Sequence, residues 1–339
     1  MKAMVIEEYN KDMVYRDYPD PKIQDSDEVI IKVKACGVCA TDLKVLSGHT
    51  PSEGLPRIAG HEVMGEVVEI GFNVTNVKPG DRVVSSTYLA CGTCKHCREG
   101  RETLCEHLSG RLGISVDGGF AQLMRIKARN LAKVPDGVKD EEAAILPCGA
   151  GVPYHSLVKR IRISPVDRIV IIGTGGVGLQ AVQIAKLCGA QVVGVDIDDE
   201  KLKLAKKYGA DYLVNSTQPN FVEKLKEIGN LTVLFDTSGY NSVIQSCAST
   251  LEKGAKLLLI GYGPGKNFNM ILEDIVRREY DIIGSNGVSI EDLGDLMGLL
   301  ADKKICPIVQ THPLTELNEI CKKIEANEVI GRMVMIPED

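Results

Sequence analysis

The hydrophobic pattern divides the chain into two regions. In the first 150 residues, short runs of β-branched residues bounded by Gly, Pro or Asp predict strands at 29–35, 63–70 and 81–87. After Pro147, buried-strand patterns alternate with stretches of helical periodicity. We therefore expect a β-rich, loop-rich unit followed by a parallel sheet with helices on both faces.

The alternation in the second region is regular. The expected strands are 168–172, 191–196, 213–214, 231–235 and 256–260. The expected helices between them are 177–187, 200–208 and 221–228. Beyond Gly284 the pattern is helical over 289–302 and mixed from there to the end. The sequence holds no internal repeat and no low-complexity segment, which favours two packed domains without a flexible tether.

A glycine-rich loop follows the strand at 168–172. It reads Gly173-Thr174-Gly175-Gly176-Val177-Gly178 and fits G-x-G-x-x-G. Between a strand and a helix, such glycines allow a tight turn, and the helix N-terminus offers N–H groups to a pyrophosphate. Asp196 ends the next strand, where a carboxylate binds ribose hydroxyls and repels a 2′-phosphate, so NAD is favoured over NADP. The alternative is a structural glycine turn with a chance aspartate.

Composition limits the classes of protein that this chain can be. Its 339 residues are 44% hydrophobic and 25% charged, which is typical of a two-domain globular protein. The formal charge of −6 comes with no basic stripe, so nucleic acid is not expected as a partner. Acidic residues appear before any apolar stretch of signal-peptide length, and no segment approaches the roughly 18 apolar residues of a membrane span. We expect a cytoplasmic protein that does not bind membranes.

Four of the eleven cysteines lie close together in the sequence. They give C-x2-C-x2-C-x7-C, formed by Cys91, Cys94, Cys97 and Cys105. Four thiolates can close a tetrahedral shell around zinc, and a closed shell indicates a structural metal site, in a lobe at about 88–108. A nucleic-acid-binding zinc ribbon and a pair of disulfides are the alternatives, disfavoured by the acidic chain and the cytoplasmic prediction. We interpret the cysteines outside both candidate metal sites as small core residues: Cys36, Cys188, Cys247, Cys306 and Cys321.

Three residues far apart in the sequence could hold a second metal ion. Cys39 follows a strand and a glycine, His61 comes about twenty residues later, and Cys148 lies where the chain passes into the second region. Two cysteines and a histidine leave zinc one open position for a water, alcohol or carbonyl oxygen. Taken singly, each residue is more typical of ordinary core packing.

These motifs together resemble the zinc-containing medium-chain alcohol dehydrogenase family over nearly the whole chain. The resemblance rests on Cys39-x-Thr41-Asp42, Gly60-His61-Glu62, the four-cysteine lobe, Cys148, the glycine loop with Asp196, and Gly331-Arg332. It implies an α/β protein with a GroES-like β-barrel catalytic domain at 1–149 and 285–339, and a doubly wound Rossmann NAD-binding domain at 150–284. It also implies two zinc ions per subunit, one catalytic and one structural, and a homodimer or homotetramer.

The resemblance also implies roles for single residues. Cys39, His61 and Cys148 correspond to the catalytic zinc ligands, with Glu62 as an acid that can join or leave the shell. Thr41 corresponds to the hydroxyl that passes on the alcohol's proton, and Asp42 to a partner for His61. Arg332 corresponds to an arginine on the cofactor pyrophosphate.

The chain departs from the family pattern at two places. The relay histidine that is common three residues beyond Thr41 is replaced by Lys44. Where relatives often carry a threonine under the nicotinamide, this chain has Val152-Pro153-Tyr154. His49 or His155 could compensate, although each is interpreted more simply as an ordinary loop or helix residue.

The expected activity is hydride transfer between NAD(H) and the alcohol or carbonyl carbon of a small alcohol, aldehyde or ketone. A polyol or L-threonine-type zinc dehydrogenase of the same family is the first alternative. Zinc-free enoyl or quinone reductases of the superfamily are disfavoured because they lack Cys39, His61 and the four-cysteine lobe. An alternative of a different class is a non-catalytic NAD-binding redox sensor or scaffold, which would not need an open zinc site made by two cysteines and a histidine.

Overall fold

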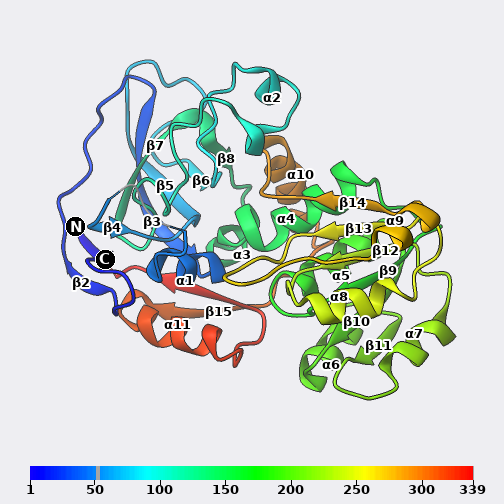
Figure 1. The fold of residues 1–339 in the computed structure, drawn as a ribbon. Helices are drawn as coiled ribbons and strands as arrows, with labels where there is room; N and C mark the ends of the chain where they lie inside the picture. The colour runs from blue at the N-terminus through cyan, green and yellow to red at the C-terminus, as the bar shows by residue number, and fades with distance from the viewer. Residues whose placement is uncertain (51–53, 339) are drawn as a thin grey trace. The chain divides into compact units, whose positions relative to one another are not determined.

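The computed structural model describes residues 1–50 and 54–338, which form two compact units (Figure 1). The first unit comprises Met1–Gly151 and Gly287–Asp339, and the second comprises Val152–Asn286. No helix in the described part of the chain is long and apolar enough to cross a membrane.

The first unit is built mainly from antiparallel strands. Their bounds are β1 (Lys2–Ile6), β2 (Val14–Asp17), β3 (Glu28–Gly37), β4 (Arg57–Ile58), β5 (Glu62–Ile70), β6 (Arg82–Ser85), β7 (Leu123–Lys127), β8 (Leu131–Lys133), β15 (Val309–Pro313) and β16 (Arg332–Ile336). One sheet has the order β15-β16-β3-β5-β6-β8, with β7 also paired to β3, and a smaller sheet has the order β2-β1-β4. The long strand β3 is central because it pairs with β5, β7 and β16, and it ends two residues before Cys39.

Short helices of the first unit carry or support the candidate site. Their bounds are α1 (Ala40–Leu46), α2 (Lys95–Arg98), α3 (Asp140–Ala144), α10 (Ile290–Ala301), α11 (Leu317–Glu325), the 3-10 turns at Glu102–Leu104, Ala128–Asn130 and Leu314–Glu316, and a π-helical turn at Leu146–Ala150. Helix α10 begins with a capping box, because the Ser289 hydroxyl accepts from the Asp292 N–H and Asp292 accepts from the Ser289 N–H.

The second unit is a six-stranded parallel sheet flanked by helices. Its strands are β9 (Arg168–Ile172), β10 (Gln191–Asp196), β11 (Tyr212–Asn215), β12 (Val233–Asp236), β13 (Lys256–Leu259) and β14 (Asp281–Gly284), in the order β11-β10-β9-β12-β13-β14. Its helices are α4 (Gly151–Tyr154), the π-helical His155–Arg160, α5 (Gly178–Leu187), α6 (Asp199–Lys207), α7 (Phe221–Ile228), α8 (Asn241–Ala248) and α9 (Leu272–Arg278). The order of the strands reverses beside β9, so the loop that follows β9 lies at the topological switch point where doubly wound folds bind ligands.

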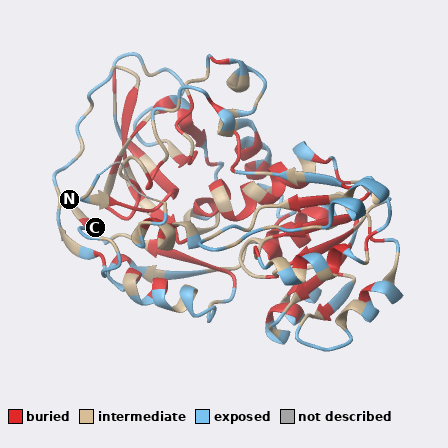
Figure 2. Cartoon of the chain, in the orientation of Figure 1, coloured by how far each residue is buried: buried red, intermediate tan, exposed pale blue. Residues whose placement is uncertain are grey.

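Burial follows from the hydrophobic patterns. The middle strands β9, β10 and β12 are buried along nearly their whole length, whereas the edge strand β14 is largely exposed (Figure 2). Near-continuous apolar strands are what a sheet covered on both faces requires. The predicted α/β architecture, with a parallel sheet in the second region, is therefore confirmed.

Candidate active site

Cys39 is the N-cap of helix α1 and lies two residues after the end of β3. The Cys39 backbone N–H donates to Asp42 Oδ2 at 2.8 Å, so the side chain of the third helical residue satisfies a backbone donor at the helix N-terminus. Both residues are buried. This local bond fixes the backbone that presents the Cys39 thiol.

The same carboxylate holds His61, which directly precedes β5. His61 Nδ1 lies 3.1 Å from Asp42 Oδ1, and the Gly60 N–H donates to that oxygen at 3.2 Å. Burial alone would lower the pKa of His61, but the charge of Asp42 and its hydrogen bond raise it well above the ordinary value. A proton on Nδ1 donated to Asp42 leaves Nε2 with a lone pair for a metal ion.

Cys148 lies on the π-helical turn Leu146–Ala150, a local widening of the helix that is frequent at functional sites. Its Sγ lies 3.7 Å from Cys39 Sγ. A hydrogen bond from Cys148 lowers the pKa of Cys39 well below its ordinary value, and the same bond raises the pKa of Cys148. The two sulfur atoms are therefore close enough for one thiol to donate a hydrogen bond to the other.

Glu62 brings a carboxylate to the same place. Its Oε1 is ion-paired with Arg332 Nη2, and both side chains are buried. Burial raises the pKa of Glu62, opposed by the charge of Arg332. Its Oε2 is buried and has no hydrogen-bond partner within the described residues. A Cβ at position 37 would lie 2.2 Å from this oxygen, so a larger residue there would require the Glu62 side chain to move.

The geometry fits a zinc ion. The ligand atoms of Cys39, His61, Glu62 and Cys148 all lie within 4.8 Å of one another. Two sulfurs bound to one tetrahedral zinc at about 2.3 Å each would lie about 3.8 Å apart, which matches the observed 3.7 Å. The unpartnered Glu62 oxygen is an acceptor that a cation would satisfy.

The four-cysteine lobe forms a second cluster with all sulfurs in reach of one ion. The sulfur atoms lie within 4.8 Å of one another, at separations that include 3.5 Å between Cys94 and Cys97 and 3.9 Å between Cys91 and Cys97. The Thr93 and Cys94 N–H groups donate to Cys91 Sγ, and with the Thr93 hydroxyl they lower the pKa of Cys91 to about 5. All four cysteines are free, so the disulfide alternative is wrong for this structure. The lobe offers the closed shell of four sulfurs that a structural zinc requires.

The cofactor loop has the geometry that its glycines predict. A Cβ on Gly178 would lie 1.8 Å from the Gly173 oxygen, and Gly173 itself has a φ of +86°. A Cβ on Gly175 would meet no protein atom within 4 Å, so the glycine there leaves open space that a closely approaching ligand would use. Helix α5 begins at this loop without a side-chain cap, so its first N–H groups are oriented for an anion. The residues therefore fit a dinucleotide pyrophosphate.

Asp196 lies beside this loop at the end of β10. Its Oδ2 accepts from the Thr174 N–H at 2.6 Å, and its Oδ1 accepts from the Ile197 and Asp198 N–H groups. These bonds fix the carboxylate at the carboxyl edge of the sheet, where the sequence prediction requires it.

Four other residues considered from the sequence differ in their burial. Thr41 lies on α1 and is partly exposed, whereas His49 is exposed and His155 is buried in a π-helical turn. Lys44 lies one turn beyond Thr41; burial lowers its pKa, opposed by the negative charges of Cys39 and Cys148. The interpretation of Cys306 as a core residue is wrong, because it is exposed in the loop before β15.

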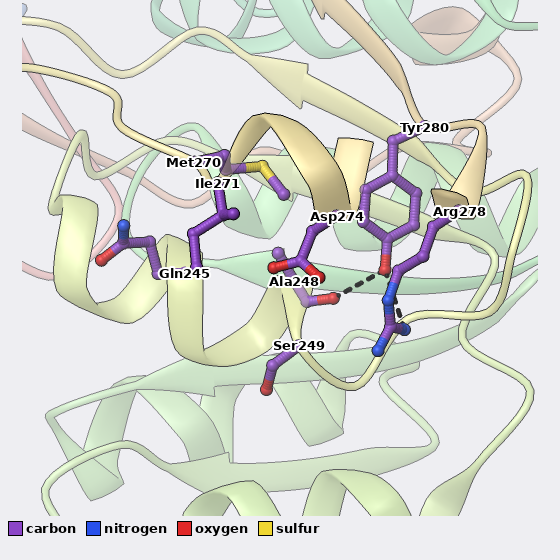
Figure 3. A pocket seen from close by; sticks show the side chains of 8 residues that line it. All are labelled: Gln245, Ala248, Ser249, Met270, Ile271, Asp274, Arg278 and Tyr280. Carbon is purple, nitrogen blue, oxygen red and sulfur yellow. Dashed lines mark hydrogen bonds between the residues drawn. The ribbon is translucent and has the colours of Figure 1, made fainter. Parts of the chain in front are cut away.

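The sequence did not predict the ion pair between Glu62 and Arg332, nor a surface pocket of about 320 Å³ on the second unit (Figure 3). The pocket lies between α8 and α9, with Tyr280 donating to the Ala248 oxygen at its floor. It contains none of the predicted site residues: its walls are Gln245, Ala248, Ser249, Met270, Ile271, Asp274, Arg278 and Tyr280. No sequence motif marked it, since its polar groups mainly stabilise the surrounding helices.

The second unit has a parallel-sheet dinucleotide fold. The strand-rich first unit carries one cluster of two cysteines and a histidine and another cluster of four cysteines. Together these features define the class of zinc-binding dehydrogenases. Family models agree: residues 25–136 match the alcohol dehydrogenase GroES-like domain, and residues 176–302 match the zinc-binding dehydrogenase domain. The chain belongs to the zinc-containing medium-chain alcohol dehydrogenase family, as the sequence motifs suggested, and is an oxidoreductase of that family.

Individual relatives span the whole chain. An alcohol dehydrogenase of Geobacillus stearothermophilus is 37% identical over 338 residues, covering 99% of each chain. An acryloyl-coenzyme A reductase of Sulfurisphaera tokodaii is 36% identical and covers 99% of this chain and 100% of its own. Among solved structures, acetophenone reductase from Geotrichum candidum in complex with NAD has a TM-score of 0.90 at 30% identity, covering 99% of this chain and 96% of its own.

Proposed function

We propose that this protein is a zinc-dependent, NAD(H)-linked dehydrogenase that transfers hydride to or from the alcohol or carbonyl carbon of a small substrate. The observation that carries the proposal is the cluster of Cys39, His61, Cys148 and Glu62. Its two sulfur atoms have a zinc-like separation, and one Glu62 oxygen has no hydrogen-bond partner among the residues that the structure describes. Two thiolates and an imidazole leave zinc an open position, which is the ligand set known for catalytic zinc in alcohol dehydrogenases.

When bound, zinc supplies a Lewis acid that lowers the pKa of an alcohol, and nicotinamide supplies the hydride acceptor. The protein's own residues position these groups and handle the proton. Asp42 holds His61 in one tautomer and orientation through its 3.1 Å contact. Thr41, on the same helix, provides the hydroxyl that takes the substrate proton outward. Glu62 would supply a further carboxylate ligand, and the charge of Arg332 opposes the rise in the Glu62 pKa that burial causes.

Three further assignments are part of the proposal. Asp196 favours NAD over NADP, since its fixed carboxylate would repel a 2′-phosphate. The four-cysteine lobe holds the second, structural zinc. The pyrophosphate role of Arg332 stays a prediction, because the structure shows its guanidinium on Glu62 with the Nε atom buried and unpartnered in the described part of the chain.

The protein's setting is also proposed. Eleven free cysteines are typical of a reducing compartment, which supports a cytoplasmic location. The edge strand β14 and helix α9 expose apolar side chains, namely Ile271, Leu272, Val276 and Ile282. An exposed strand edge beside apolar side chains supports a homodimer or homotetramer, because such an edge otherwise invites pairing with other chains.

The substrate class has two candidates. Small alcohols, aldehydes and ketones are the first, with polyols or L-threonine as a narrower variant. The acryloyl-coenzyme A reductase relative supports a second: reduction of the C=C bond of an unsaturated thioester, for which a zinc ion held by Cys39, His61 and Cys148 would supply a Lewis acid. The sequence disfavoured only zinc-free enoyl and quinone reductases, which lack the metal ligands of this chain. A reductase that has these ligands is compatible with the sequence.

One experiment separates these candidates. The purified chain is analysed for zinc and then assayed for NAD reduction on alcohols, polyols and L-threonine, and for NADH oxidation on aldehydes, ketones and acryloyl-coenzyme A. Cys148→Ala should lose activity and one of the two zinc ions. Cys321 is a buried cysteine outside both clusters, so Cys321→Ala should keep its activity and both zinc ions. Two zinc ions per chain with no turnover on any substrate would instead support the NAD-binding sensor or scaffold.

A further inference from the structure

A cation and an aromatic ring lie together on two loops of the second unit. Lys266 Nζ lies 2.9 Å from the centroid of the Tyr240 ring. Tyr240 precedes α8, in the connection that leaves the carboxyl end of β12, and is 61% exposed. Lys266 belongs to the glycine-rich connection between β13 and α9. Both connections begin at the carboxyl edge of the parallel sheet, where doubly wound folds bind ligands.

The connection after β12 contacts the cofactor loop, and the two connections contact each other. The Thr237 hydroxyl, directly after β12, donates to the Gly173 oxygen at 3.2 Å. A Cβ on Gly261 would lie 2.4 Å from the Gly239 nitrogen, so the connections after β12 and β13 are packed backbone to backbone. The segment that carries Lys266 is also tied to α8, because the Asn269 N–H donates to Asn241 Oδ1 at 2.8 Å. The ammonium is therefore held on the side of the sheet where the glycine loop offers its N–H groups.

Several carboxylates at this edge of the sheet favour a cation nearby. Asp196 ends β10, Asp198 and Asp199 follow it, and the buried Asp236 ends β12. Burial raises the pKa of Asp236, while its hydrogen bonds from Ser238 and Gly239 and the positive charge of Lys266 act against that rise. Among residues 1–50 and 54–338, no carboxylate forms an ion pair with Lys266; its ammonium rests on an aromatic face, a weak interaction when exposed. A doubly charged pyrophosphate at the glycine loop would be a stronger partner.

We propose that Lys266 is a cofactor-positioning residue, whose ammonium leaves the Tyr240 ring to contact the pyrophosphate of the dinucleotide. This inference rests on the proposed NAD-binding function and adds a cation from outside the glycine motif. Tyr240 holds the ammonium beside the site until the cofactor arrives. The glycines at positions 261, 263 and 265 give the connection the backbone freedom for this short movement.

The test is a binding measurement on the intact, zinc-containing chain. NADH is titrated through its own fluorescence, since the chain has no tryptophan to transfer energy to it, and ADP-ribose is measured by displacement. The variants are Lys266→Gln, Lys266→Arg and the control Lys253→Gln. Lys253 is an exposed lysine of the same unit, but it precedes β13 and so lies toward the amino edge of the sheet.

We expect Lys266→Gln to weaken NADH and ADP-ribose by about fivefold at low salt, and the loss to shrink at high salt because charges at an exposed site are screened. Lys266→Arg and Lys253→Gln should stay within about twofold of the unmodified chain. Unchanged binding of NADH and ADP-ribose in Lys266→Gln overturns the assignment to the pyrophosphate while leaving the proposed function intact. Failure of the unmodified chain to bind NADH would contradict both the assignment of Lys266 and the proposed NAD-linked function.

Discussion

Asp42 is the residue on which the geometry of the candidate zinc site depends most. Its two carboxylate oxygens accept from the Cys39 N–H at 2.8 Å and the Gly60 N–H at 3.2 Å, and contact His61 Nδ1 at 3.1 Å. Asp42→Asn keeps the shape but replaces one acceptor oxygen by an NH2 group. With the amide oxygen kept toward His61, that NH2 group faces the Cys39 N–H, donor against donor.

Two losses follow from this change. A buried N–H left without an acceptor costs about 1–3 kcal/mol of folding free energy. Removing the charge that orients a metal-binding histidine lowers metal affinity by about 10- to 100-fold, or about 1.4 to 2.7 kcal/mol. We therefore expect Asp42→Asn to weaken zinc binding at one of two sites by that factor and to lower the free energy of unfolding of the zinc-free chain.

Zinc affinity is measured by competition with a chromophoric chelator, and stability by urea unfolding. Glu28→Gln is the matched control, because Glu28 is also a buried carboxylate of the first unit that accepts two backbone N–H groups, from Gln24 and Asp25. It should lose stability without changing zinc affinity. Zinc affinities within twofold of the unmodified chain at both sites of Asp42→Asn would refute the reasoning.

Three other predictions test separate parts of the account. Arg332→Met leaves the Glu62 charge buried without its partner, so urea unfolding should show a loss of about 3–5 kcal/mol in the free energy of unfolding. The double variant with Glu62→Gln should recover part of this loss, and an equal loss in the single and double variants would contradict a stabilising ion pair. Cys105→Ala should reduce the zinc content from two ions to one and lower the thermal midpoint, while two retained ions would contradict the assignment of the four-sulfur site. Asp196→Ala should reduce the ratio of NADH affinity to NADPH affinity by about ten- to a hundredfold in titrations. An unchanged affinity ratio would show that this carboxylate does not determine the choice of cofactor.

Local patterns predicted much of the fold. The strands at 168–172 and 191–196 and the helix at 221–228 were expected with the bounds that the structure has. Their periodicity is strong because one face or both faces are buried. The strand expected at 81–87 is shorter and ends at Ser85, and the Ser86 N–H then donates to the Asn130 oxygen in another segment. Such a strand end depends on a partner from elsewhere in the chain.

Long-range pairings account for what the sequence did not predict. Strand β16 had no clear pattern, yet it pairs with β3 and brings Arg332 to Glu62, 270 positions away along the chain. The Asp42 contacts to Cys39 and His61 required only two neighbouring loops, so motif spacing was a better guide there. The cation–aromatic pair of Tyr240 and Lys266 joins two loops without a recognisable motif and became visible only in the structure.

X-ray absorption spectroscopy at the zinc edge tests the central claim most directly, since it reports the number and kind of ligands. The unmodified chain should contain two zinc ions with an averaged shell rich in sulfur, and Cys105→Ala should leave one ion bound by two sulfurs, one imidazole nitrogen and one oxygen. A remaining ion with four sulfur ligands, or no remaining ion at all, would contradict a zinc site built from Cys39, His61 and Cys148.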